Sequence, residues 1–138
     1  MNDEQARAAG LRWLAAGGPW LDGMLPDGAP QSGRSWSGTP DIRRHRVTRT
    51  GLRNGARRYD GFAPDFRDGA TRGAALEWLR EQWDCPVLST EGVRLLNGST
   101  VWTWIADHTP VSLTVAALYE DTEPALYPAA AEALKEQR

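Results

Sequence analysis

Two Asn-Gly dipeptides constrain the fold of this chain more than any other feature of its sequence. Asn54-Gly55 lies between RVTRTGLR and ARRYDGF, and Asn97-Gly98 lies inside GVRLLNGSTVWTWI. Asn-Gly is the strongest short signal for the two-residue turn of a β-hairpin, because both residues tolerate positive φ. We therefore predict two antiparallel hairpins, one within residues 42–62 and one within residues 93–105.

The two predicted hairpins differ in how much of their surface they can bury. A two-residue turn in the first one places Arg49 opposite Asp60, and neither face of this hairpin is apolar throughout. In the second, the same turn places four apolar side chains on one face, which we expect in the core: Val93, Leu95, Trp102 and Trp104. The second hairpin should thus anchor the sheet, and the first should bury only part of one side.

Three segments have the sequence pattern of helices. The first is expected at residues 3–16, capped by Asn2 or Asp3 and stopped by two glycines; the second covers residues 70–83, with Asp68 as its cap. In the second helix Leu76, Leu79 and Trp83 form the expected buried stripe. The third is expected to begin near Pro128 and run to the end, because proline suits a first helical position. Residues 111–117 alternate like a strand, with a short helix as the alternative.

These elements predict an α+β fold. A chain of 138 residues with 41% hydrophobic and 25% charged residues is long enough for one domain with a real core. We expect residues 1–138 to form a single small domain, in which an antiparallel sheet built from the two Asn-Gly hairpins packs with three helices.

Charge is distributed unevenly along the chain. The formal net charge is −2, but residues 34–58 hold eight arginines against Asp41 alone, so this stretch carries +7 and the remainder −9. An overall acidic molecule is not a general polyanion binder, which normally needs several unopposed phosphate contacts. Any phosphate contact should therefore be local to the arginine-rich stretch.

Several classes of site are disfavoured by composition. A lone Cys85 excludes an internal disulfide and multi-cysteine zinc sites, and pairing it with His45 or His108 as a nucleophile is a remote alternative. The two histidines lack the helical spacing of a metal site, and Asp65 and Asp68 suit a turn and a helix cap better than a carboxylate pair. We expect no catalytic residues, no metal and no cofactor.

The N-terminal residues MNDEQARAAG lack the apolar core of a signal peptide, and no stretch has the 18 or so apolar residues needed to span a bilayer. The expectation is a cytoplasmic protein with no membrane association.

Three segments resemble a group of small tailed-phage and prophage proteins, some described as phage αβα-sandwich domains. They are GGPWLDGML at residues 17–25, PDFRDGATRGAALEWLREQWDCP at 64–86, and Ala-Glu-Ala-Leu at 131–134. The resemblance implies an α+β fold and a mobile-element origin. It implies no catalytic residues, because the group has no established common activity.

The arginine-rich stretch is the strongest candidate binding surface. Arginines spaced along two strands could hold the phosphates of a nucleic acid or a nucleotide, with aromatic residues stacking on bases. Docking on an acidic protein surface, or a solvated edge hairpin that blocks aggregation, are the alternatives. The candidate residues are Arg43, Arg44, Arg46, Arg49, Arg53, Arg57, Arg58, Trp36 and Tyr59.

Trp78 is a second candidate for binding. It lies on the side of its predicted helix away from the buried stripe, so it is either an interface anchor or is covered by a loop or a dimer mate. Trp20 and Trp36 are weaker anchors of the same kind.

The features above favour a protein that binds over one that catalyses. Our preferred hypothesis is a phage or prophage accessory protein, monomeric or homodimeric, that binds a host macromolecule, such as an anti-CRISPR inhibitor of a defence effector. The alternatives are a nucleotide or nucleic-acid binding module that uses the arginines, and a structural or assembly component of the virion.

Overall fold

The computed structural model describes residues 1–27, 45–54, 59 and 61–137, and has an α+β fold, as predicted. Two helices flank the middle of the chain, α1 at Asp3–Ala15 and α3 at Gly69–Gln82, with the short α2 at Arg49–Asn54 between them. After these come α4 at Pro110–Ala116 and α5 at Glu123–Gln137. One small antiparallel sheet pairs β1 (Pro26–Asp27) with β2 (Ala63–Pro64). The other has the order β3-β4-β5, with β3 at Ser89–Arg94, β4 at Thr100–Ile105 and β5 at Tyr119–Glu120.

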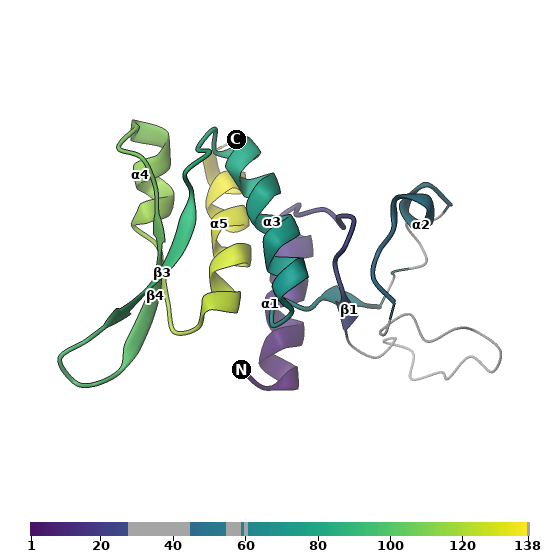
Figure 1. Ribbon diagram of the computed structural model, residues 1–138, viewed down its shortest axis with the longest axis horizontal. Helices are drawn as coiled ribbons and strands as arrows, with labels where there is room; N and C mark the ends of the chain where they lie inside the picture. Colours follow the sequence, from purple (N-terminus) through teal and green to yellow (C-terminus); the bar gives the residue numbers. More distant parts are fainter. Residues whose placement is uncertain (28–44, 55–58, 60, 138) are drawn as a thin grey trace.

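The three longer helices form the centre of the molecule. Figure 1 shows α1, α3 and α5 side by side, with the three-stranded sheet and α4 on one side and β1 and α2 on the other. Helix α5 is in contact with α1, α3 and β4, so it joins the helical layer to the sheet.

A continuous series of aromatic contacts runs through the core. Trp13 of α1 meets Phe66 at a ring-centroid distance of 5.4 Å, Phe66 stacks on Tyr127 of α5 at 5.5 Å, and Tyr127 meets Trp104 of β4 at 5.3 Å. All four side chains are at most 2% exposed. Because each contact joins a different element, these rings tie the helices to the sheet.

The caps predicted for α1 and α3 are confirmed. The Asn2 side chain accepts the backbone N–H of Gln5 at 2.8 Å, and the Gln5 side chain accepts that of Asn2 at 3.0 Å, which forms a capping box. Asp68 accepts the N–H of Thr71 at 2.9 Å and so begins α3. The buried stripe of α3 differs in one position: Ala75 joins Leu79 and Trp83 inside, while Leu76 is half-buried.

The first predicted hairpin is wrong in its first strand. Residues 49–54 are helical because Thr48 caps them: its hydroxyl accepts the N–H of Gly51 and its carbonyl the N–H of Leu52, both at 3.0 Å. Val47 instead exchanges backbone hydrogen bonds with Gly23 and Met24 at 2.8 Å each. Since neither face of the predicted hairpin was apolar throughout, no core face held it extended. The predicted turn at residue 55 and the predicted partner Asp60 lie outside the described residues.

The second hairpin is confirmed, with a register one residue away from the prediction. Leu95 and Ser99 form the closing pair, with Leu95 N–H to the Ser99 carbonyl at 2.8 Å, and Gly98 has a φ of +86°. The loop therefore has three residues and a glycine bulge, which the Asn-Gly signal also permits. Gly92 now lies opposite Trp102, and Val93 lies opposite Val101.

This shift changes which side chains enter the core. Trp104 is buried as predicted, but Val93 and Leu95 are 37% and 41% exposed. The predicted apolar face that joined them to the tryptophans is therefore wrong, because a one-residue slip moves a strand's side chains to the other face.

Two further predictions concern the C-terminal part. Residues 110–116 form a helix, the alternative to the predicted strand, because Thr109 caps them and Pro110 occupies the first turn. Helix α5 begins at Glu123, before the predicted start near Pro128, which lies inside the helix. The earlier first turn is stabilised because it buries Leu126 and Tyr127.

Candidate functional site

Among the described arginines of the candidate set, Arg46 forms an ion pair. Its guanidinium makes a two-pronged contact with the Asp68 carboxylate, at 2.5 and 2.9 Å, and also donates to the Gly23 carbonyl at 3.3 Å. The hydrogen bond from Arg46 lowers the pKa of Asp68 to about 2, and the Thr71 N–H adds to this effect. Arg46 therefore holds the segment just before α2 against the N-terminus of α3.

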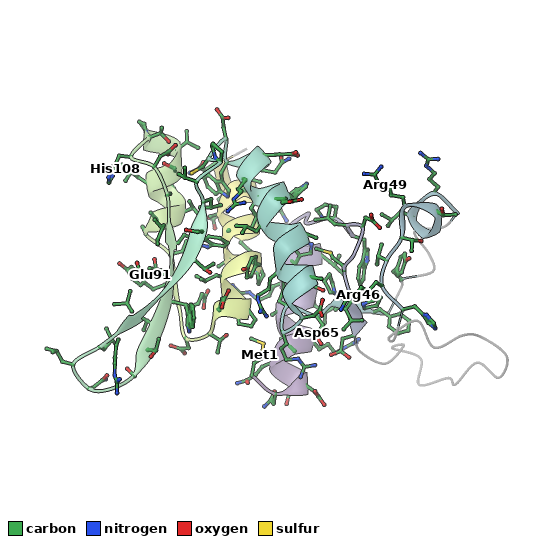
Figure 2. The ribbon with its side chains drawn as sticks, viewed as in Figure 1. Met1, Arg46, Arg49, Asp65, Glu91 and His108 are labelled. Carbon is green, nitrogen blue, oxygen red and sulfur yellow. The ribbon has the colours of Figure 1, made fainter. Side chains whose placement is uncertain are left out.

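Arg49 and Arg53 are placed differently. Both lie on α2, both are exposed, and neither forms an ion pair with another described residue. In Figure 2 Arg49 lies beside α2, away from the three central helices, whereas Arg46 lies closer to them. The other members of the set lie outside the described residues: Arg43, Arg44, Arg57, Arg58 and Trp36.

Tyr59 and Trp78 are both covered in part by other aromatic residues. Tyr59 is 5% exposed and its ring lies 5.1 Å from that of Trp20. Trp78 is half-buried, with its ring edge-on to Trp13 at 5.2 Å. Trp78 also lines a shallow pocket of about 220 Å³, together with Leu21, Asp22, Ala74, Glu77 and Glu81. One face of Trp78 thus belongs to the core, and this pocket lies beside it.

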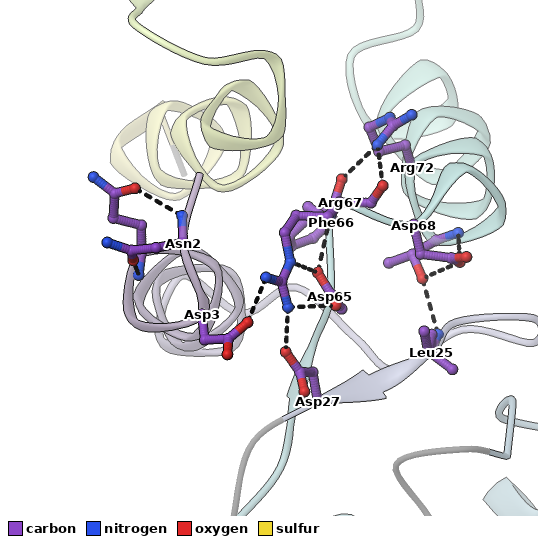
Figure 3. A network of polar contacts seen from close by, with 11 residues as sticks. Asn2, Asp3, Leu25, Asp27, Asp65, Phe66, Arg67, Asp68 and Arg72 are labelled. Carbon is purple, nitrogen blue, oxygen red and sulfur yellow. Dashed lines mark hydrogen bonds and ion pairs between the residues drawn. The ribbon is translucent and has the colours of Figure 1, made fainter.

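Sequence reasoning missed Arg67, the centre of the most connected polar network. Its guanidinium donates to Asp3 at 2.7 Å, to Asp27 at 2.8 Å and to Asp65 at 3.0 Å (Figure 3). These carboxylates come from α1, β1 and the turn before α3, so the network joins three segments. Asp65 also accepts the backbone N–H of Arg67 at 3.0 Å, the turn role expected for it.

The groups considered for catalysis differ in burial or hold turns of the backbone. Cys85 is fully buried, while His45 and His108 are exposed. Asp107 accepts hydrogen bonds from Ser112 and Thr109, which lower its pKa and hold the first turn of α4. Within the described residues no group of three or more His, Cys, Asp or Glu side chains could hold a metal ion.

Exposed apolar side chains gather in one part of the chain. Of the large hydrophobic residues exposed in the described part, only Met1 and Leu11 lie elsewhere. The rest lie on β3, β4, α4, β5 and the adjoining loops: Val87, Val93, Leu95, Leu96, Ile105, Val111, Leu113 and Tyr119. We call this set the apolar surface. The sequence could not reveal it, because the predicted register placed Val93 and Leu95 in the core.

The chain segment that carries the apolar surface is acidic in sequence. Residues 87–123 contain five acidic side chains and one arginine, a net charge of −4: Glu91, Asp107, Glu120, Asp121 and Glu123 against Arg94. The arginine-rich stretch and the apolar surface therefore differ in both charge and polarity.

The fold and these surfaces define a small α+β protein, in whose described residues no helix is long and apolar enough to cross a membrane. Comparison with protein-family models, curated proteins and solved structures finds no match for this chain. The resemblance to phage αβα-sandwich proteins therefore stays a prediction.

Proposed function

We propose that this protein acts by binding a macromolecule through its apolar surface, as a non-enzymatic accessory protein of a phage or prophage. Its target would be a host protein in the cytoplasm, such as a CRISPR effector that the protein inhibits. The observation that carries the proposal is the concentration of exposed apolar side chains on residues 87–119.

Such a concentration of apolar side chains is typical of an interaction surface. Scattered exposed hydrophobics are normal on any protein, whereas a contiguous group rimmed by polar residues marks a binding site. Leu96 at the hairpin tip is fully exposed, and Val111 and Leu113 of α4 are each 50% exposed. Burial of these side chains against a partner would supply the hydrophobic part of the binding free energy.

The proposal is tested by phage plating on cells that carry an active CRISPR effector and produce the protein. Wild-type protein should raise the plating efficiency of a targeted phage. Leu96→Asp and Leu113→Asp should abolish this effect, because a charge in a buried interface is costly. Leu11→Asp, at an exposed apolar position outside the apolar surface, serves as the matched control and should keep the effect.

The proposal fails if wild-type protein protects no phage from any effector type and copurifies with no host protein. It also fails if Leu11→Asp and Leu96→Asp lose the effect equally at equal protein levels.

A phosphate-binding role is the second candidate. It is favoured by the +7 charge of residues 34–58 and by Arg49 and Arg53, which are exposed and form no ion pair with another described residue. Titration with a single-stranded oligonucleotide at two salt concentrations tests it. A true phosphate site loses affinity steeply with salt, and the double variant Arg49→Glu, Arg53→Glu should bind at least tenfold more weakly. Equal binding by the variant would exclude these two arginines.

A further inference from the structure

Within the described residues, strand β3 is one edge of the three-stranded sheet, and the two-residue β5 is the other. The order β3-β4-β5 leaves β3 paired on one side only, with all six of its residues matched to β4. Figure 1 shows the β3–β4 hairpin extending beyond the helices. Residues 91–94 are exposed, so the edge is accessible over most of its length.

The hydrogen-bond pattern identifies the backbone groups that face outward. Leu95 and Ser99 are a hydrogen-bonded pair. Because such pairs alternate with non-bonded ones in antiparallel strands, Val93 and Glu91 also bond to β4, while Arg94 and Gly92 point their N–H and C=O groups away from it. Among the described residues, no backbone group reaches Arg94 or Gly92 from that side.

Trp102 gives this edge an aromatic surface. Gly92 and Trp102 are direct partners, and a Cβ added to Gly92 would lie 3.3 Å from the Cη2 and Cζ2 atoms of the indole. The far edge of the indole therefore lies over Gly92, on the face of β3 that Gly92 shares with Trp102. A side chain beside Gly92 on an added strand would cover the ring, which is half-buried in the protein alone.

The surroundings of this edge favour a basic partner. On the face that carries Trp102, Glu120 lies opposite Trp102 on β5, and Glu123 accepts a hydrogen bond from Thr90 of β3 at 3.2 Å. These carboxylates are shared with Arg12 and Arg72, and the aromatic face itself attracts ammonium and guanidinium groups. Exposed Val93 and Leu95, on the face opposite Trp102, would meet apolar side chains of the same strand.

We propose that β3 is a docking edge for an extended segment of a partner protein, in which basic and apolar residues alternate and which adds to the sheet as a fourth strand. Strand addition supplies main-chain hydrogen bonds for affinity, and alternate side chains supply specificity. The inference rests on the proposed binding function and names the chemistry of the partner.

The direct test uses a nine-residue peptide in which lysine alternates with valine, with a glutamate–valine peptide of the same length as control. NMR hydrogen exchange of the wild-type protein should show at least tenfold slower exchange at Gly92 and Arg94 with the lysine peptide. The amide of Val93, which already bonds to β4, serves as the internal control and should not change. The glutamate peptide should bind at least tenfold more weakly.

Two variants at one position separate the backbone from the side chain. Arg94→Pro removes the outward N–H without touching a bond to β4, since proline is tolerated on the free side of an edge strand. Arg94→Gln removes the same charge and keeps the N–H. The lysine peptide should bind Arg94→Gln at least as tightly as wild type, because Arg94 lies on the Trp102 face that would receive the lysines. It should bind Arg94→Pro at least tenfold more weakly than it binds Arg94→Gln.

Several results would overturn the inference: equal binding by Arg94→Pro and Arg94→Gln, equal binding of both peptides, or unchanged exchange at Gly92 and Arg94. A dimer in which these two amides are already protected would show that a second copy occupies the edge instead. The peptide experiment needs neither host nor phage, so its failure is separable from that of the proposed function. If Arg94→Pro keeps its effect in the plating assay while Leu96→Asp loses it, the binding function stands without this edge.

Discussion

At the scale of single residues, the arginine side chains of this protein fall into two groups, those in ion pairs and those exposed to solvent. Arg67 and Arg46 form ion pairs with carboxylates and so hold segments of the chain together. Arg49 and Arg53 are exposed to solvent. The sequence shows the number of arginines but not this division, since the carboxylates that neutralise Arg67 come from positions 3, 27 and 65. Such a meeting of distant residues depends on the packing of α1 against the turn before α3.

Arg67→Leu is expected to destabilise the protein by about 1–3 kcal/mol, because Asp65 is 8% exposed and would lose its charged partner. Arg53→Leu, at an exposed arginine without an ion pair among the described residues, is the control and should change stability by about 0.5 kcal/mol or less. Urea denaturation at pH 7 measures both. Equal effects of the two variants would contradict the network's role.

The ion pair between Arg46 and Asp68 should make stability depend on acid. Since the pKa of Asp68 is lowered from 3.8 to about 2, its contribution is fully present above about pH 4 and is lost as the pH falls through about 2. Asp68→Asn keeps a good helix cap but removes the charge. The difference in unfolding free energy between wild type and this variant should therefore be positive at pH 7, fall below about pH 4 and become small as the pH passes below about 2. A difference that is constant between pH 7 and pH 2 would assign it to something other than the carboxylate.

At the scale of elements, the two Asn-Gly dipeptides show where local sequence signals suffice. Asn97-Gly98 lies in the loop of a real hairpin. This hairpin is stable because the buried Trp104 anchors β4 against α5. The segment before Asn54-Gly55 lacks such an anchor, and the Thr48 cap makes it helical. The exact register of β3 and β4 depended on the loop length, which the dipeptide alone leaves open between two and three residues.

Gly98→Ala tests the loop that sets this register. Its φ of +86° is strained for alanine, so a loss of about 1–2 kcal/mol in stability is expected. Gly73→Ala is the matched comparison: Gly73 is exposed inside α3, and an added Cβ meets nothing within 4 Å. This variant should instead stabilise by about 0.5–1 kcal/mol. Thermal unfolding measures the stability of both variants relative to wild type. A Gly98→Ala protein as stable as wild type would contradict the bulged loop.

At the scale of the whole molecule, one series of aromatic contacts connects the helical layer to the sheet. The exposed arginines of α2 and the apolar surface both lie outside this core. Trp13 is the end of the series in α1, with its Nε1 donating to the Pro19 carbonyl at 2.9 Å. Its ring contacts both Phe66 and Trp78, so it also supports the shallow pocket that Trp78 lines.

Trp13→Ala should cost about 3–5 kcal/mol and leave little folded protein, since it removes a fully buried indole. Trp20→Ala is the comparison, because Trp20 is only half-buried, and its cost should be clearly smaller. Circular dichroism during urea denaturation measures both. Similar midpoints for the two variants would place the centre of the core elsewhere.

The sequence by itself determined the α+β class, the helices α1 and α3 with their caps, and the existence of the β3–β4 hairpin. These features depend on side chains within a few residues of each other, whose capping and turn preferences act locally. The Thr48 cap that makes residues 49–54 helical is local as well, although the Asn-Gly signal had pointed to a strand there. Tertiary structure alone decided the register that exposes Val93 and Leu95 and the network around Arg67. Each of these depends on burial or on partners far along the chain, and the free energy of such contacts exists only once the elements have packed together.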